Sequence, residues 1–143
     1  MAFNGSFLAT SFKKELLTAT HNFTNGSGHT FKLALYSNSA TLNAATEVYT
    51  TNGEVTGNGY SAGGNTLTNQ TPTNSGTTGL TDFADTSFSN ATITARGALI
   101  YNSSASNKAV AILDFGSDKA ASSGTFSVIF PTPDANNAII RIA

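Results

Sequence analysis

Short apolar segments constrain the fold of this chain most, because turn-forming residues interrupt them at spacings of roughly 10–15 residues. In residues 31–36, Phe and Leu alternate with Lys and Ala, the period of a strand with one buried face. Residues 124–130 repeat this alternation with Phe126, Val128 and Phe130. Many short strands joined by turns are typical of antiparallel sheets. The pattern predicts an all-β fold, an antiparallel β-sandwich of jelly-roll or immunoglobulin-like type with a short N-terminal helix.

The expected strands are short, and glycine or proline bounds several of them. Gly116 and Pro131 follow two of the strongest apolar segments. The polar stretch 73–81 is expected to be a linker. The expected strands cover residues 31–36, 48–51 with 54–55, 66–71, 86–88, 91–101, 109–115, 124–130 and 138–142.

Residues 11–18 are the one segment with a clear helical pattern. Ser11 is suited to cap the helix, and Leu16 lies four residues after Phe12 on the same face. A helix of about two turns is not stable alone in water, so it must pack against another surface. Residues 1–30 are expected to form an N-terminal arm that carries this helix, and residues 31–143 the sandwich domain.

The arm has two open roles. It either covers one end of its own sandwich or docks on another protein. The apolar side chains that would make such a contact with a partner or with a second copy are Phe3, Phe7, Phe12 and Leu16.

The composition favours a structural or binding module over an enzyme. The chain has 22 Thr, 16 Ser and 15 Asn, but only 15 charged residues and no Cys or Trp. Because catalytic sites need titratable groups that converge, we expect neither an enzyme nor a cofactor. A net charge of −1 without a basic cluster gives no indication of nucleic-acid binding. No apolar run approaches the roughly 20 residues that span a bilayer, so no membrane partner is expected.

Four glycines, Gly57, Gly59, Gly63 and Gly64, surround Tyr60 in one short segment. Such glycines could cradle an anion with their backbone amides. A phosphate-binding loop would also need a following lysine and a helix, and the sequence provides neither. We therefore expect a structural turn, with Tyr60 packed against its neighbours.

Three further polar residues stand out. Arg96 lies within an apolar strand, so its charge must be paired if it is buried. Its expected partner is Asp114 or Asp85, or a neighbouring subunit, which makes Arg96 another candidate contact residue. His21 and His29 are a weak indication of a metal site, because no Cys accompanies them. We expect them to be solvent-exposed or to lie at an oligomer axis.

Several segments resemble, in order, a known family. Residues 54–64 read Glu-Val-Thr-Gly-Asn-Gly-Tyr-Ser-Ala-Gly-Gly, and residues 94–101 read Thr-Ala-Arg-Gly-Ala-Leu-Ile-Tyr. Asp-Phe-Ala-Asp at 82–85 lies between these two segments, and Leu-Asp-Phe-Gly at 113–116 and the closing segments 124–130 and 139–142 follow them. This series resembles small virion structural proteins of tailed bacteriophages over roughly residues 30–142.

The resemblance implies a capsid decoration (cement) protein that binds the major capsid protein on the outer surface of the head and stabilises the shell. It further implies assembly in the host cytoplasm and a final position on the virion. A homo-oligomer is expected, and a trimer would match the local threefold points of an icosahedral shell. The alternatives are a small tail or head-fibre component, or a carbohydrate-binding host-attachment module. Sugar-binding sites use exposed Trp or Tyr rings, and this chain has four Tyr and no Trp.

Overall fold

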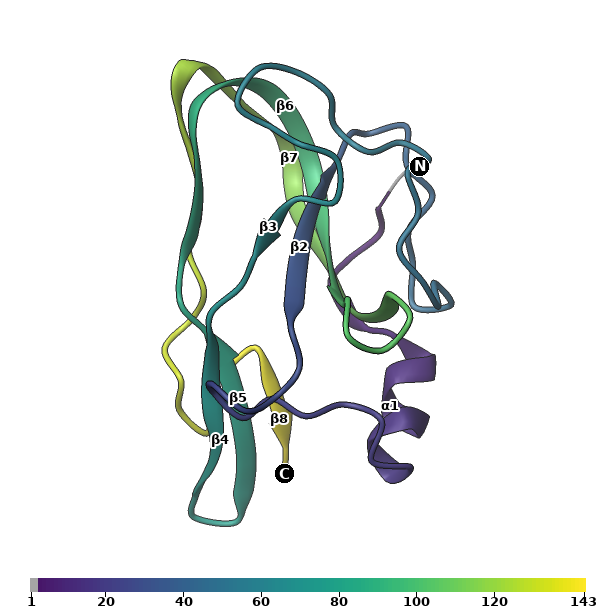
Figure 1. The fold of residues 1–143 in the computed structure, drawn as a ribbon, viewed down its shortest axis with the longest axis vertical. Helices are drawn as coiled ribbons and strands as arrows, with labels where there is room; N and C mark the ends of the chain where they lie inside the picture. Colours follow the sequence, from purple (N-terminus) through teal and green to yellow (C-terminus); the bar gives the residue numbers. More distant parts are fainter. Residues whose placement is uncertain (1–2) are drawn as a thin grey trace.

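Two antiparallel sheets and one short helix make up the protein in a computed structural model, which describes residues 3–143 (Figure 1). The larger sheet has the strand order β1-β7-β6-β2-β3, and the smaller sheet has the order β4-β5-β8. The predicted all-β sandwich with a short helix is confirmed. The element bounds are β1 Phe7–Leu8, α1 Thr10–Leu17, β2 Phe31–Tyr36, β3 Asn65–Thr66, β4 Asn69–Ser75, β5 Thr78–Phe83, β6 Thr86–Asn102, β7 Lys108–Val128 and β8 Ile140–Ile142.

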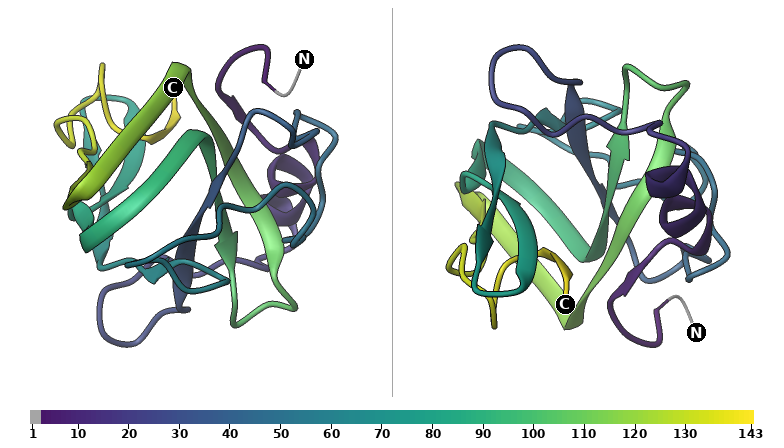
Figure 2. Two further views of the ribbon diagram at one scale, coloured as in Figure 1. Left: turned by 90° about the horizontal axis from the view of Figure 1, so that it is seen from above. Right: turned by 90° about the horizontal axis from the view of Figure 1, so that it is seen from below.

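The long hairpin of β6 and β7 forms the centre of the larger sheet. Figure 2 shows α1 at one side of the molecule and β4, β5 and β8 at the other. The sequence predicted four separate strands here, but two continuous strands span those segments. The expected strand end at Gly116 is wrong, since this residue lies inside β7 with a φ of 81°. The pairing of β6 with β7 shifts register at several positions. The turn-forming residues here therefore mark β-bulges within the strands and not strand ends.

The expected linker at residues 73–81 is wrong as well. Residues 69–83 form the β4–β5 hairpin, in which Ser75 pairs with Thr78 around a two-residue loop. Gly76 begins that loop with a φ of 60°, a conformation that glycine adopts without strain. Pro72 is accommodated because β4 is an edge strand, and the register shifts beside it.

Other strand boundaries also differ from the sequence prediction. Residues 48–51 and 54–55 form no strands and contribute only the isolated bridges of Val48 to Lys108 and of Glu54 to Tyr36. The segment predicted at residues 66–71 is divided between β3 and β4. Only β2 has the bounds that the alternating pattern predicted.

Helix α1 begins at Thr10, with Ala9 at its N-cap and no side-chain cap. Ser11 is therefore not the cap, and its hydroxyl is buried without a hydrogen-bond partner. The backbone N–H of Thr10 instead donates to the carbonyl of Ala44 at 2.8 Å. A tertiary contact thus replaces the local cap that the sequence suggested.

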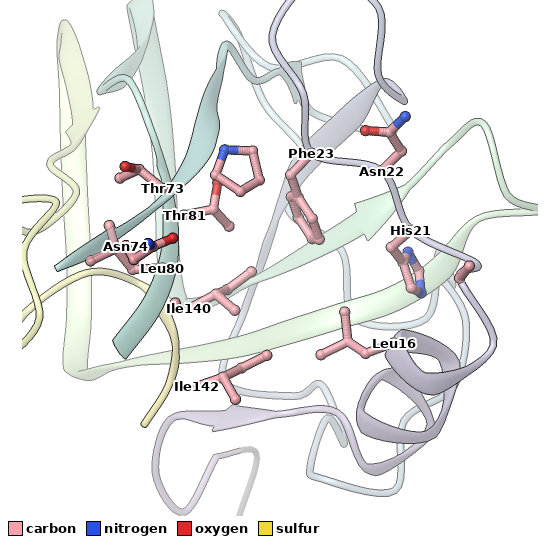
Figure 3. Close-up of a pocket in the computed structure, with 13 residues that line it drawn as sticks. Leu16, His21, Asn22, Phe23, Thr73, Asn74, Leu80, Thr81, Ile140 and Ile142 are labelled. Carbon is pink, nitrogen blue, oxygen red and sulfur yellow. The ribbon is translucent and has the colours of Figure 1, made fainter. Parts of the chain in front are cut away.

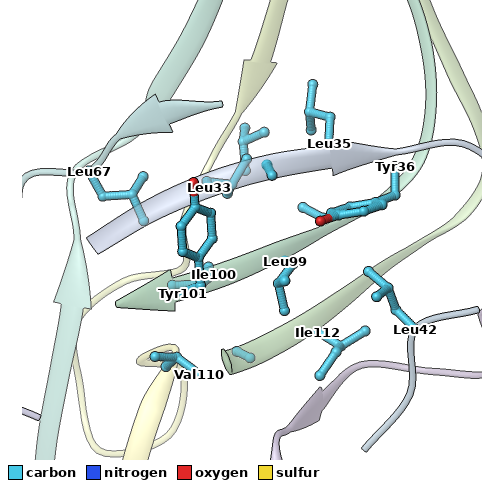
Figure 4. Packing of buried hydrophobic residues seen from close by; sticks show 14 of the residues in the cluster. Leu33, Leu35, Tyr36, Leu42, Leu67, Leu99, Ile100, Tyr101, Val110 and Ile112 are labelled. Atoms are coloured by element: carbon cyan, nitrogen blue, oxygen red, sulfur yellow. The ribbon is translucent and has the colours of Figure 1, made fainter. Parts of the chain in front are cut away.

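The N-terminal segment shares one hydrophobic core with the sheets. Figure 4 shows part of this core, with side chains from β2, β6 and β7 packed together. Phe3 and Phe12 are fully buried in the same cluster, together with Phe23 and Phe31 from the following loop and β2. Phe3 and Phe12 are core residues in this structure, which corrects the contact role expected for them. Their rings cannot meet a partner while they are buried in their own domain.

Replacement of Phe12 by Ala should lower the free energy of unfolding by about 3–5 kcal/mol, because it removes a buried ring and leaves a cavity. Urea denaturation followed by circular dichroism measures this loss. Leu17→Ala is the matched control in the same helix, since Leu17 is 89% exposed and should change stability by less than about 0.5 kcal/mol. Equal losses in the two variants would contradict the docking of α1 described here.

Candidate functional site

The glycine-rich segment packs closely against strands of the larger sheet. A Cβ on Gly64 would overlap the carbonyl of Leu33 in β2. A Cβ on Gly59 would lie 2.7 Å from the Cα of Ala91 in β6. Both glycines have positive φ angles, 75° and 80°, which L-residues rarely adopt. The close packing leaves no room for side chains at these positions, as expected of a structural turn.

The carboxylate of Glu54 is the shared hydrogen-bond acceptor of this segment. The hydroxyl of Tyr49 donates to Oε2 at 2.6 Å, and the hydroxyl of Tyr60 donates to Oε1 at 2.6 Å. The backbone N–H of Gly63 donates to Oε1 at 2.7 Å. The hydroxyl of Tyr60 in turn accepts the N–H of Leu35 at 3.0 Å. We call Glu54, Tyr49, Tyr60 and Gly63 the Glu54 network.

The two remaining tyrosines extend this network. The hydroxyl of Tyr101 donates to the carbonyl of Gly63 at 2.7 Å, and that of Tyr36 donates to the carbonyl of Thr50 at 2.6 Å. The rings of Tyr49 and Tyr101 stack with their centroids 4.7 Å apart. All four tyrosines of the chain are therefore engaged inside the protein.

These surroundings favour the neutral phenols. Burial, followed by the negative charge of Glu54, raises the pKa of Tyr101 to about 12. Burial and Glu54 also raise the pKa of Tyr36 above its ordinary value. Burial and the hydrogen bond to Glu54 do the same for the pKa values of Tyr49 and Tyr60. Ionising any of these phenols would place a second negative charge near Glu54.

A groove of about 600 Å³ lies between α1 and the smaller sheet (Figure 3). Leu16 of α1 and Phe23 line it on one side, and Leu80 of β5 and Ile140 of β8 line it on the other. Its lining is mainly apolar. We call this the α1–β8 groove.

Exposed apolar side chains lie around the same end of the molecule. Ile142, 61% exposed, lines the groove, and Leu17, 89% exposed, follows Leu16 at the end of α1. A second hollow of about 250 Å³ contains Phe7 of β1 and Arg141 of β8. Because side chains alternate across a strand, these two hollows lie on opposite faces of β8. The expected contact residues Phe7 and Leu16 therefore line hollows at this end.

Arg96 lies on β6, opposite the irregular part of β7. Its Nε atom is 3.5 Å from Oδ1 of Asp114, so its charge is paired within its own chain. Asp114 also accepts the backbone N–H of Gly5 at 3.1 Å, which connects the N-terminal segment to β7. Asp85, the other expected partner, instead accepts the N–H of Phe130 at 2.7 Å.

His21 is not solvent-exposed, which corrects the sequence-based expectation. Its side chain is fully buried, and its Nε2 lies 2.9 Å from Oε1 of Glu15. Both His21 and His29 approach the amide of Asn102, which is itself fully buried. Lys108 lies 3.2 Å from Oε2 of Glu15. We call these five residues the His21 network.

Within residues 3–143, no three His, Cys, Asp or Glu side chains are placed to hold a metal ion. In the same part of the chain, no helix is long and apolar enough to cross a membrane. Comparison with protein-family models, curated proteins and solved structures finds no match to this chain.

Sequence reasoning missed the central acceptor, Glu54, and the amide of Asn102. Glu54 begins the glycine-rich segment six residues before Tyr60, and this acidic residue in a chain with few charges was the available signal. Asn102 gave no signal, because it is one of 15 asparagines and its partners are distant in sequence.

The tyrosines generate a prediction for alkaline pH. Because their pKa values are raised in the folded state, the tyrosines bind their phenolic protons more tightly in the folded protein than in the unfolded chain. The stabilisation of the fold that results is fully present below the ordinary tyrosine pKa of about 10 and is lost at higher pH. Spectrophotometric titration of the folded protein to about pH 11 should show little tyrosinate absorbance, while a sample in urea titrates near pH 10. Two or more tyrosines ionising near pH 10 with the circular dichroism unchanged would refute this arrangement.

Gly64→Ala should destabilise the protein by more than about 2 kcal/mol, because the new methyl group meets the Leu33 carbonyl in a strained backbone conformation. Gly79→Ala is the matched control, since a Cβ there meets nothing within 4 Å. The midpoint of urea unfolding should shift strongly only for Gly64→Ala. Similar midpoints for both variants would count against the close packing of this segment.

Proposed function

We propose that this chain is a structural protein of a tailed-phage virion, and specifically a decoration protein on the outer surface of the head. The proposal is supported by the hydrogen bonds and the packing of residues 54–64. In this segment, which resembles the phage family, Glu54, Tyr60 and Gly63 bond to one another, and Gly64 packs on β2. The segment thus supplies internal support for a rigid sandwich, as a protein that works through its surface requires.

The proposed contact surface for the major capsid protein is the α1–β8 groove with its rim. It combines an apolar hollow with the exposed side chains of Leu17 and Ile142. Burying such surface stabilises a complex by roughly 25 cal/mol per Å² of apolar area before the costs of association. Several linked copies would raise the apparent affinity through their effective concentration, so an oligomer, for example a trimer, suits the role.

The tyrosine geometry speaks against a carbohydrate-binding module. A sugar-binding site needs an aromatic face that is open to solvent. Tyr49 and Tyr101 stack on each other, and the hydroxyls of all four tyrosines bond within the protein. The alternative is a position on the tail or on a head fibre, and the following experiment distinguishes it from the decoration role.

The purified protein should co-sediment with capsids of the encoding phage that were assembled without it. The expected result is saturable binding at a fixed ratio to the major capsid protein, together with greater survival of the shells on heating. Binding to purified tails but not to heads would contradict the decoration role.

Ile142→Asp tests the surface itself, because it places a charge at the groove where Ile142 is exposed. Capsid affinity should fall at least about tenfold, a loss of about 1.4 kcal/mol. Val48→Asp is the control, since Val48 is 50% exposed and does not line the groove. Equal affinity of the two folded variants would exclude the groove as the contact surface.

A further inference from the structure

Strand β8 is an outer strand of the smaller sheet, whose order is β4-β5-β8. One edge of β8 pairs with β5, with Ile142 opposite Gly79 and Ile140 opposite Thr81. Within the described part of the chain, the other edge pairs with no strand. Figure 1 shows β8 between β5 and α1. The free edge of an outer strand presents unpaired N–H and C=O groups, to which another chain can add as a further strand.

The β4–β5 hairpin indicates which groups of β8 lie on this free edge. Ser75 and Thr78 pair around the two-residue loop, so the N–H of Thr78 points toward β4. Successive residues of a strand direct their backbone groups to opposite sides, so those of Gly79 point toward β8 and those of Leu80 toward β4. Arg141 is the partner of Leu80 in β8. The N–H and C=O of Arg141 therefore point away from β5, onto the free edge.

The two faces of β8 carry different side chains. Ile140 and Ile142 line the α1–β8 groove, and Figure 3 shows both around the same space as Leu16. Arg141 lies on the opposite face and lines the second hollow together with Phe7 of β1. A strand added to the free edge would place alternate side chains on these two faces. Because both linings are mainly apolar, they suit a segment that is itself rich in apolar side chains.

Arg141 adds a requirement for charge. This residue is exposed, and its guanidinium donates to the carbonyl of Ala135 at 3.3 Å. Its charge contributes, after hydrogen bonds from Asn137, to the lowered pKa of Asp134, but among the described residues it forms no ion pair. Directly opposite residues of antiparallel strands share a face, and opposite charges there attract. The free edge therefore favours a strand with Asp or Glu opposite Arg141, between apolar neighbours.

A second copy of β8 does not meet this requirement. Because β8 spans only Ile140–Ile142, a symmetric pairing along its full length would place Arg141 opposite the same residue of the other copy. Like charges directly opposite each other destabilise a pair of strands. The charge at the centre of β8 thus favours a strand from a different protein.

We propose that the capsid partner binds by strand addition: an extended segment with an acidic residue between apolar ones pairs with the free edge of β8 and inserts apolar side chains into the α1–β8 groove. The inference rests on the proposed function for the identity of the partner, the major capsid protein. The mode of binding rests on β8 itself. Main-chain hydrogen bonds supply affinity in such a complex, and the groove and Arg141 supply specificity.

A defined peptide tests the mode of binding without capsids. The probe is the acetylated and amidated peptide Thr-Val-Glu-Val-Thr, and its matched control has lysine in place of glutamate. In an NMR titration, the amide resonance of Arg141 should shift as its N–H gains an acceptor, and the glutamate peptide should reach half-saturation at a several-fold lower concentration. No shift at Arg141 with either peptide, or equal affinities, would overturn the inference.

Arg141→Pro tests the same edge on capsids, because it removes the outward N–H at a position where an outer strand tolerates proline. Arg141→Ala is the matched control, since it removes the same side chain and keeps the N–H. Capsid affinity of Arg141→Pro should be at least about tenfold below that of Arg141→Ala, because an acceptor in the interface loses its donor. Slow exchange of the Ile140 and Ile142 amides would show that β8 of each variant still pairs with β5.

The outcomes separate this inference from the proposed function. Equal capsid affinity of the two folded variants would overturn strand addition and leave the decoration role standing. Binding of the glutamate peptide by a protein that binds no capsids would contradict the decoration role and support strand addition with another partner. If Arg141→Pro does not fold, the peptide titration of the unaltered protein decides.

Discussion

The arrangement of the glycine-rich segment depends on the hydrogen bonds that the carboxylate of Glu54 accepts. This carboxylate accepts hydrogen bonds from Tyr49, Tyr60 and Gly63, which draws a long connection onto the faces of β2 and β6. Hydrogen bonds to charged groups contribute about 1.5–3 kcal/mol each, against a total stability of about 5–15 kcal/mol for an ordinary domain. A chain with few charges thus uses one of them as a structural centre.

Polar residues in this protein hold together segments that the hydrophobic pattern alone leaves unspecified. Asp114 connects the N-terminal segment to β7 and pairs with Arg96. The buried carboxylate of Asp82 accepts the N–H groups of Phe83 and Ile139, which joins β5 to the segment before β8. Hydrogen bonds and an ion pair of side chains therefore hold the sandwich together where the backbone hydrogen bonding of its sheets ends.

The sequence allowed the fold class to be predicted, and it allowed β2 to be placed with its bounds, because alternation and length agree there. It did not show the β4–β5 hairpin, whose strands are polar and which Pro72 interrupts. Gly116 suggested a strand end, but the ladder continues through a bulge. The pairings within the Glu54 and His21 networks could not be predicted, since the partners come together only through tertiary packing.

The proposed contact surface and the His21 network meet at one place. His21 belongs to the buried network and also lines the α1–β8 groove beside Leu16. Release of residues 10–30 would therefore remove one wall of the groove. On this account, the contacts that His21 makes with Glu15 and Asn102 help to maintain the surface proposed to bind the shell.

A reconstruction of the intact virion by electron microscopy tests the central claim most directly. The account predicts density for this sandwich on the outer surface of the head, with α1 and β8 facing the major capsid protein and Ile142 covered. Density at the tail, or a head-bound copy with the α1–β8 groove open to solvent, would contradict it.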